Sequence, residues 1–140
     1  MRLSVRRLTS SVFDERDIIY YMKAIFFSAL YLLILFSVSE FIFNPAYLYY
    51  EIVWLDVPMH IFGGFGVASL TWAILRYKKI EVSYIKLVTV YLLVAVFWEL
   101  YEYIHDLMIM REWNGWVDTA SDIINGGIGM SSLYLFVRKK

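Results

Sequence analysis

The stretch AIFFSALYLLILFSVSEFIF, residues 24–43, contains twenty residues and a single charged side chain, Glu40. About twenty predominantly apolar residues in a helix are enough to cross the hydrocarbon core of a bilayer. Asn44-Pro45 follows directly, and proline disfavours helix at the residue before it. The stretch therefore predicts a membrane-crossing helix over residues 24–43.

The composition of the whole chain agrees with a membrane environment. Hydrophobic residues make up 61% of the 140 residues, aromatic residues make up 19%, and the mean hydropathy is +0.60. A soluble domain of this size must cover itself with polar surface, so this composition excludes that class. The length allows about four crossings with short loops and no second domain. The chain has no cysteine, which excludes disulfides, thiolate metal sites and a cysteine nucleophile.

Three further helices are predicted from apolar runs and helix-boundary residues. The second helix is expected over residues 57–75, because Asp56-Val57-Pro58 is typical of a helix start. Further apolar runs predict helices over residues 85–104 and 116–137. Residues 46–55, AYLYYEIVWL, are too short to span and carry the aromatic side chains typical of a membrane–water interface. The sequence thus predicts an all-α integral membrane protein, a four-transmembrane-helix bundle with a short interfacial segment between its first two helices.

Basic residues are concentrated in three segments, and this distribution predicts the topology. Residues 1–23 hold five Lys and Arg, residues 76–86 hold four and residues 138–140 hold three, leaving only Arg111 elsewhere. With an even number of crossings these segments share one side, which the positive-inside rule makes cytoplasmic. We therefore expect a multi-pass protein of the plasma or inner membrane with both termini in the cytoplasm. Residues 1–23 are expected to be a retained basic segment, interfacial or disordered, ahead of a single membrane domain over residues 24–140.

This topology places the polar residues of the last three helices toward the extracytoplasmic side. On each helix they fall on one stripe at helical spacing. Carboxylates facing lipid are costly, so the three stripes are expected to face one another around a shared pocket. The predicted site consists of Asp56, His60, Glu99, Glu102, Asp118, Asp122 and Asn125.

Several of these residues also have a purely structural interpretation. Asp56 and Asp118 stand where acids cap helix N-termini, and His60 could be a hydrogen-bonded packing residue. Capping does not account for Glu99 or Asp122, which lie inside or near the ends of otherwise apolar helices. The combination therefore favours a functional pocket over a set of unrelated structural residues.

The residue types in this pocket are those that bind a hard divalent cation. The pocket offers carboxylate, imidazole and amide groups, which suit metals that prefer oxygen and nitrogen ligands, and Arg111 is the one basic residue nearby. A bound cation would also offset the repulsion between the acids. The spacing Glu99-x-x-Glu102-x-x-His105 partly matches the Glu-x-x-His pattern of carboxylate-bridged di-metal bundles. We expect a divalent metal ion with ligands among Asp56, His60, Glu99, Glu102, Asp118, Asp122 and Asn125.

Three short motifs contain the polar residues: Asp56-x-x-x-His60, Trp98-Glu99-x-x-Glu102 and Asp118-Thr119-x-x-Asp122-x-x-Asn125-x-x-x-Gly129. Their order and spacing over about residues 50–135 resemble those of VanZ-like membrane proteins and the related YjdF-type inner-membrane proteins. VanZ-like members usually have glutamine at the position of Glu102. The glutamate in this chain is nearer the YjdF type. VanZ-like proteins are associated with glycopeptide-antibiotic resistance, whereas YjdF-type proteins have no assigned activity. The resemblance supports the positions of the site residues rather than a reaction.

The first functional hypothesis is a cell-envelope protein that binds a metal ion and engages a lipid-linked or other amphipathic headgroup. Nucleic acid is not expected as a partner. In an enzyme, this pocket would suit hydrolysis or transfer at a phosphate ester, with Glu99 or Asp122 holding the metal and His60 acting as general acid or base. The alternatives are a small proton- or ion-coupled transporter, since intramembrane acids are typical of these, and a non-catalytic subunit in a homo-oligomer or with a membrane partner. The cytoplasmic halves of the helices offer few polar residues for a transport path.

Overall fold

The computed structural model describes residues 15–109 and 115–138, which are almost entirely helical and contain no strand. Four long helices are joined by short connections. A π-helical turn extends the first helix, and a short helix and a 3-10 turn lie between the first two long helices. In chain order the elements are α1 (Glu15–Val38), the π-helical turn Ser39–Phe43, α2 (Leu48–Glu51), the 3-10 turn Val53–Leu55, α3 (Asp56–Tyr77), α4 (Tyr84–Met108) and α5 (Trp116–Val137).

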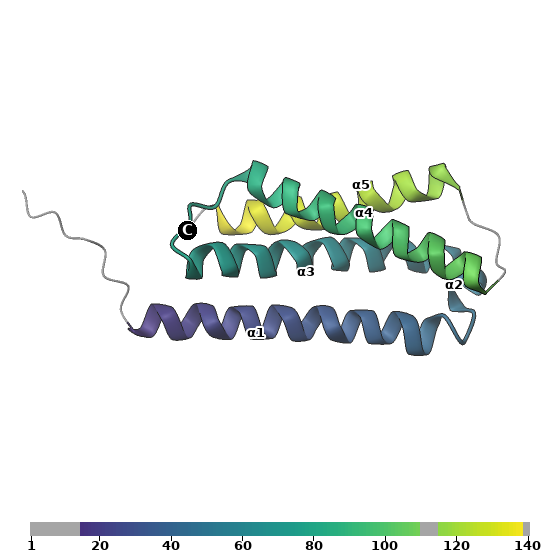
Figure 1. The fold of residues 1–140 in the computed structure, drawn as a ribbon, viewed down its shortest axis with the longest axis horizontal. Helices are drawn as coiled ribbons and strands as arrows, with labels where there is room; N and C mark the ends of the chain where they lie inside the picture. Colours follow the sequence, from purple (N-terminus) through teal and green to yellow (C-terminus); the bar gives the residue numbers. More distant parts are fainter. Residues whose placement is uncertain (1–14, 110–114, 139–140) are drawn as a thin grey trace, which may run out of the picture.

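The long helices alternate in direction along one common axis (Figure 1). The start of α1, the α3–α4 connection and the end of α5 lie at one end, and the α1–α3 connection with α2 lies at the other. The first end, which we call the basic end, carries Arg76, Lys78, Lys79, Lys86 and Arg138. The bundle therefore gathers the basic segments of the described chain as the sequence predicts, while the side of the membrane they face stays a prediction.

Among the described residues, three helices are long and apolar enough to cross a membrane, which supports an integral membrane protein. They are Glu15–Phe43, Asp56–Tyr77 and Tyr84–Met108. Helix α5 has 22 residues, as many as α3, but its acids, amide, serines and glycines make it too polar to qualify by composition. Some of its apolar side chains point outward, with Val117 86% and Ile124 63% exposed, while Met130, Leu133 and Val137 are buried in the core.

The helix boundaries differ from the sequence prediction mainly at the start of α1. Residues 15–23, which the sequence places ahead of the first predicted helix, form the first turns of α1, so this helix begins at Glu15 and not at residue 24. Glu15 and Asp17 stabilise this N-terminus through the helix dipole, and no helix breaker follows them. Helix α4 continues to Met108 instead of residue 104, whereas α5 has the predicted bounds. Residues 1–14 of the predicted segment lie outside the described residues.

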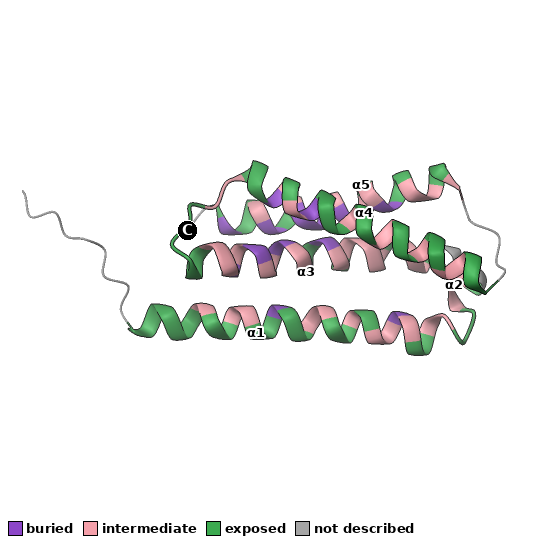
Figure 2. Ribbon diagram, in the orientation of Figure 1, coloured by how far each residue is buried: buried purple, intermediate pink, exposed green. Residues whose placement is uncertain are grey.

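Helices α3 and α5 make the closest approach in the bundle. A Cβ atom on Gly64 would overlap the carbonyl group of Gly126, and one on Gly129 would overlap the carbonyl group of Ile61. Buried residues concentrate on the facing sides of α3, α4 and α5, as Figure 2 shows. The apolar core lies in the half near the basic end and comprises Ala68, Leu87, Tyr91, Met130, Leu133 and Val137.

Helix α1 packs less tightly and forms the outer layer of the bundle against α3 (Figure 1). Its buried residue, Ser28, shares a 2.8 Å hydrogen bond with Ser69 of α3. Large apolar side chains on its outer face are exposed, with Phe26 62% and Leu33 60% exposed. An outward surface of this kind suits lipid as the surrounding solvent.

Candidate functional site

The first part of the site is a pair of side chains one turn apart on α3. His60 Nε2 lies 3.3 Å from Asp56 Oδ1, an (i, i+4) contact. The sequence also allowed Asp56 to be a helix cap, but α3 begins at Asp56 itself, and no side chain caps it. The carboxylate of Asp56 is therefore directed at His60 and not at the backbone of the first turn.

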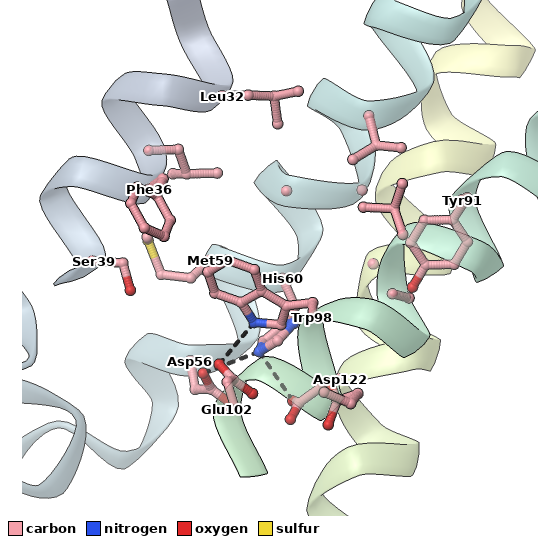
Figure 3. A pocket seen from close by; sticks show the side chains of 18 of the residues that line it. Leu32, Phe36, Ser39, Asp56, Met59, His60, Tyr91, Trp98, Glu102 and Asp122 are labelled. Atoms are coloured by element: carbon pink, nitrogen blue, oxygen red, sulfur yellow. Dashed lines mark hydrogen bonds and ion pairs between the residues drawn. The ribbon is translucent and has the colours of Figure 1, made fainter. Parts of the chain in front are cut away.

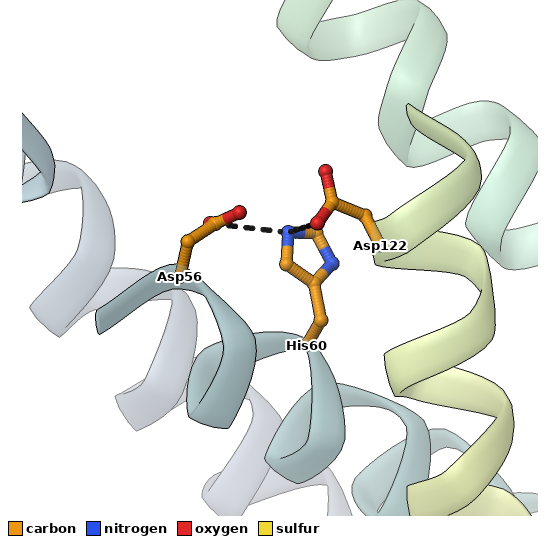
Figure 4. Close-up of side chains that lie close together, drawn as sticks. All are labelled: Asp56, His60 and Asp122. Atoms are coloured by element: carbon orange, nitrogen blue, oxygen red, sulfur yellow. Dashed lines mark ion pairs between the residues drawn. The ribbon is translucent and has the colours of Figure 1, made fainter. Parts of the chain in front are cut away.

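Helix α5 contributes Asp122 to the same point from the opposite side (Figure 4). The Asp122 residue is only 4% exposed, and its Oδ1 lies 3.6 Å from His60 Nε2. The contact between Gly64 and Gly126, one turn deeper, holds α3 and α5 close enough for this approach. One imidazole nitrogen thus lies between two carboxylates from different helices.

The geometry around His60 is a poor match for two hydrogen bonds. Nε2 carries at most one proton, and charge-assisted N–H···O bonds are usually about 2.7–2.9 Å long. A tetrahedral ion with bonds of about 2.0–2.2 Å places neighbouring ligand atoms about 3.3–3.6 Å apart. The two His60 distances, 3.3 and 3.6 Å, lie in the range of the edges of such a coordination sphere.

Helix α4 adds two carboxylates, Glu99 and Glu102, which line both of the cavities that Asp56 and Asp122 line. Glu102 is fixed by the indole of Trp98, which donates a 2.7 Å hydrogen bond to Oε1. Two groups of ligand atoms, each within 4.8 Å of one another, are present among the described residues: Asp56, His60 and Asp122 form one group, and Glu99, Glu102 and Asp122 form the other. Asp122 belongs to both, so it is the centre of the site.

The site has a large excess of potential negative charge. Residues 24–75, 87–109 and 115–137 contain no Lys or Arg. One imidazolium cannot balance four carboxylates that converge in a partly buried space, so protons or a bound cation must offset their repulsion. The donor set consists of carboxylate oxygens and one imidazole nitrogen, which suits a divalent ion that prefers oxygen and nitrogen ligands.

Two cavities meet at these acids. The inner cavity, about 280 Å³, runs from the acids toward the middle of the bundle between α1, α3 and α4. The outer cavity, about 170 Å³, opens toward the end opposite the basic end, which we call the acidic end. Residues that line both cavities are Ser39, Tyr49, Asp56, Glu99, Glu102 and Asp122. The acid cluster therefore separates an apolar inner space from a polar outer one.

The π-helical turn brings Glu40 into the outer cavity. Glu40 accepts a 3.1 Å hydrogen bond from the Tyr101 hydroxyl of α4 and a 3.2 Å bond from the Asn44 amide. Nearby, Tyr49 and Ser39 share a 2.8 Å hydrogen bond, and burial raises the pKa of the Tyr49 phenol. Tyr49 therefore stays neutral at physiological pH and can serve only as a hydrogen-bond partner.

The structure brings together five of the seven residues predicted for the site: Asp56, His60, Glu99, Glu102 and Asp122. Asp118 lines the outer cavity but belongs to neither ligand group. The Asn125 amide donates to Ser121 on its own helix at 3.2 Å, and Asn125 lines neither cavity.

Sequence reasoning did not assign Glu40, Trp98 or Tyr101 to the site, although all three contact it or line its cavities. The available signal for Glu40 was its position as a lone acid in an otherwise apolar helix. Trp98 belongs to the motif Trp98-Glu99-x-x-Glu102 but was given no role there, and Tyr101 gave no signal because Tyr is common throughout this chain.

Comparison with known proteins gives one match. A family model described as a predicted membrane protein (DUF2238) matches residues 18–139. No curated protein and no solved structure matches the chain. The family description agrees with the apolar helices, and the resemblance to VanZ-like and YjdF-type proteins stays a prediction.

Proposed function

The chain belongs to the DUF2238 family of predicted membrane proteins, and we propose that it binds a divalent metal ion at Asp122 and uses that ion to hold the phosphate headgroup of a membrane lipid. The observation that supports this proposal most directly is the pair of distances from His60 Nε2 to Asp56 and Asp122, 3.3 and 3.6 Å. In this arrangement His60 is a metal ligand and not the general acid or base that the sequence suggested.

The proposed topology has four crossings, with α5 as the fourth. Helix α5 is as long as α3 and exposes apolar side chains such as Val117, Ile124 and Phe136 on its outer surface. Its polar residues include Asp122, which is buried against the neighbouring helices. Both termini then lie in the cytoplasm with the basic end, and the acidic end lies on the extracytoplasmic side.

A phosphate needs the metal ion in order to bind here. The acidic end offers no Lys or Arg among its described residues, so a phosphate alone would be repelled by the carboxylates. A divalent ion reverses the local charge and leaves positions open for phosphate oxygens. The two faces of the site, polar outside and apolar inside, match an amphipathic molecule better than a free ion.

The same residues are suited to the hydrolysis or transfer of a phosphate ester. Asp56, His60 and Asp122 would hold the ion, which would supply Lewis-acid activation of the phosphate and of a water molecule. Glu102, which the Trp98 indole holds in place, would take the proton of that water as it attacks phosphorus and would return the proton to the leaving oxygen as the ester P–O bond breaks. Binding is the primary proposal, and this reaction is its chemical extension.

Transport is less well supported than binding. The half of the bundle near the basic end is filled by apolar side chains, including Ala68, Leu87 and Leu133. A transport path would need polar groups or water through this half as well. The described residues thus favour a site that opens toward one end over a continuous pathway.

The proposal is tested by elemental analysis and calorimetric titration of detergent-purified protein. Wild type should contain, or bind with high affinity, about one divalent ion per site. His60→Ala should lose most of this binding because it removes the ligand shared by both contacts. Glu51→Gln is the matched control, since Glu51 is exposed and lines neither cavity. Absence of metal and of metal binding in wild type, or equal binding by His60→Ala, would overturn the proposal.

A further inference from the structure

The inner cavity changes character along its length. At the acidic end it is lined by the metal-ligand candidates, and farther in it is lined by apolar side chains, glycine and Tyr91, whose hydroxyl donates to the carbonyl of Ile123 (Figure 3). The apolar wall is formed by Leu32 and Leu35 of α1, Val67 of α3, and Val94 and Ala95 of α4. A space of this kind is amphipathic along its own axis.

The position of the cavity gives it a route to lipid. It lies between α1 and α4, and both helices are candidate membrane spans. At the acidic end these helices are joined by the ring contact of Phe36 with Trp98, at 6.0 Å between centroids, and by the hydrogen bond from Tyr101 to Glu40. Toward the middle, Leu32 and Val94 line opposite walls of the cavity. The aromatic contacts thus cover the acids, and the apolar wall is at the depth of lipid chains.

Hydrocarbon is the filling that this space favours. An apolar cavity does not hold ordered water, because water needs several polar partners. If the cavity stayed empty, its walls would lose dispersion contacts. A lipid chain that moves from the bilayer into an apolar cavity exchanges one apolar surrounding for another, so selectivity comes from the headgroup at the acids and not from the chain.

We propose that the inner cavity holds one hydrocarbon chain of a membrane lipid, which enters sideways between α1 and α4 while its phosphate headgroup lies at the acid cluster. This inference rests on the proposed function, because the headgroup is held by the metal ion at Asp122. It adds that the ligand is a chain-bearing phosphate lipid taken from the bilayer, and that its chain lies inside the bundle beyond Phe36 and Trp98.

Photo-cross-linking in vesicles tests this proposal. The protein is reconstituted in phosphatidylcholine containing a small fraction of phosphatidic acid with a diazirine in one acyl chain, and adducts are mapped by mass spectrometry. Adducts should concentrate on inward-facing residues such as Leu35 and Ala95. Ala95→Phe and Leu35→Trp fill the cavity from opposite walls and should each lower these adducts several-fold. Val96→Phe is the matched control, because Val96 is the next residue, is 58% exposed and should leave them unchanged.

Metal titration of the same variants separates this inference from the proposed function. Ala95→Phe and Leu35→Trp should bind metal as wild type does, since neither residue is a ligand. Metal binding with adducts that do not respond to either cavity variant would overturn the chain-binding inference and leave the metal proposal standing. Absence of metal binding would overturn the proposed function. A diacylglycerol probe that has the same diazirine chain but no phosphate and labels the cavity as strongly as phosphatidic acid, or a cross-link to a second copy of the chain, would show the wrong occupant.

Discussion

At the scale of single residues, Asp122 connects more parts of the site than any neighbouring residue does. It is the most buried of the acids and belongs to both groups of ligand atoms. Its position on α5 makes it the link between the α3 pair and the α4 pair. Substitutions at this residue and at its neighbours on α5 therefore distinguish the arrangement in the structure from the one that the sequence alone suggests.

Asp122→Asn should lower the affinity for divalent metal by at least about 10–100-fold, the range found when even outer partners of ligands are lost. Asn125→Leu should bind metal as wild type does, because the Asn125 amide contacts Ser121 and not the acid cluster. Both changes remove polar atoms from α5, so they form a matched pair, and calorimetric titration measures both. A loss of binding with Asn125→Leu would place that amide in the site, as the sequence prediction has it.

Five of the seven residues predicted for the site converge, whereas Asp118 and Asn125 belong to neither ligand group, and the contacts between the residues could not be predicted. Helical spacing placed Asp56 with His60 and Glu99 with Glu102, because residues three or four apart share a helix face. The part of α5 that faces α3 depends on the contact between Gly64 and Gly126, which no periodicity specifies. That contact directs Asp122 inward and leaves Asn125 outside the site.

At the scale of the helix, the spacing between α3 and α5 is set by glycine. Gly64 packs against the backbone of Gly126, where an added Cβ atom has no room. Gly127 is the next residue, and a Cβ atom there would meet a Tyr91 ring atom at 3.8 Å, an ordinary contact. The contact at Gly126 therefore determines the distance between α3 and α5, and the contact at Gly127 does not.

Gly64→Ala should destabilise the bundle by about 1–3 kcal/mol, the usual cost of overpacking. It should also weaken metal binding, because moving α3 from α5 lengthens the contact between His60 and Asp122. Gly127→Ala should change neither the melting temperature nor the metal affinity appreciably. Thermal melting in detergent with and without metal measures both effects. Equal behaviour of the two variants would show that the glycine contact does not position the site.

The sequence predicted the existence of all four long helices, and it was least accurate where a helix enters or leaves the apolar region. The bounds of α5 were predicted because an apolar run begins near Trp116 and ends ahead of the basic residues 138–140. The start of α1 was placed at residue 24 because only apolar residues were counted. Charged residues such as Arg16 and Lys23 are compatible with helix, so the helix continues through them to Glu15.

At the scale of the whole molecule, charge is divided between the two ends of the bundle. Basic residues occupy the end formed by the α3–α4 connection, and the acid cluster lies toward the opposite end. If the positive-inside rule holds, this division fixes which side of the membrane the site opens to.

Single cysteines in the natural cysteine-free background test this topology. Glu51→Cys should react with a membrane-impermeant maleimide in intact cells, and Lys78→Cys should react only after the membrane is permeabilised. Both positions are exposed and lie at opposite ends of the bundle. The reverse labelling pattern would move the site to the cytoplasmic side.

The response of the folded protein to chelation distinguishes a metal from shared protons. A chelator at pH 7.5 should lower the melting temperature of wild type in detergent, and added divalent ion should restore it, because a ligand bound only by the folded state stabilises that state. If shared protons and not a metal offset the charge of the acids, the chelator should have no effect on the melting temperature. The melting temperature should then rise as the pH falls from 7.5 to 5.5, because protonation removes the repulsion between the acids.

The π-helical turn at the end of α1 also bears on how this chain tolerates changes in length. The backbone N–H of Asn44 bonds to the carbonyl of Ser39 at 2.9 Å, five residues back instead of four, so the turn holds one residue more than an α-helix needs. It is equivalent to a single-residue insertion. Deletion of the outward-facing Phe41, which is 73% exposed, would restore a regular α-helix. Because the π-turn absorbs the extra residue within a single turn, the helix on either side would keep its phase, and Glu40, which precedes Phe41, would keep its hydrogen bond with Tyr101. Relatives that lack this extra residue should therefore have an uninterrupted α1 that presents the same face to α4.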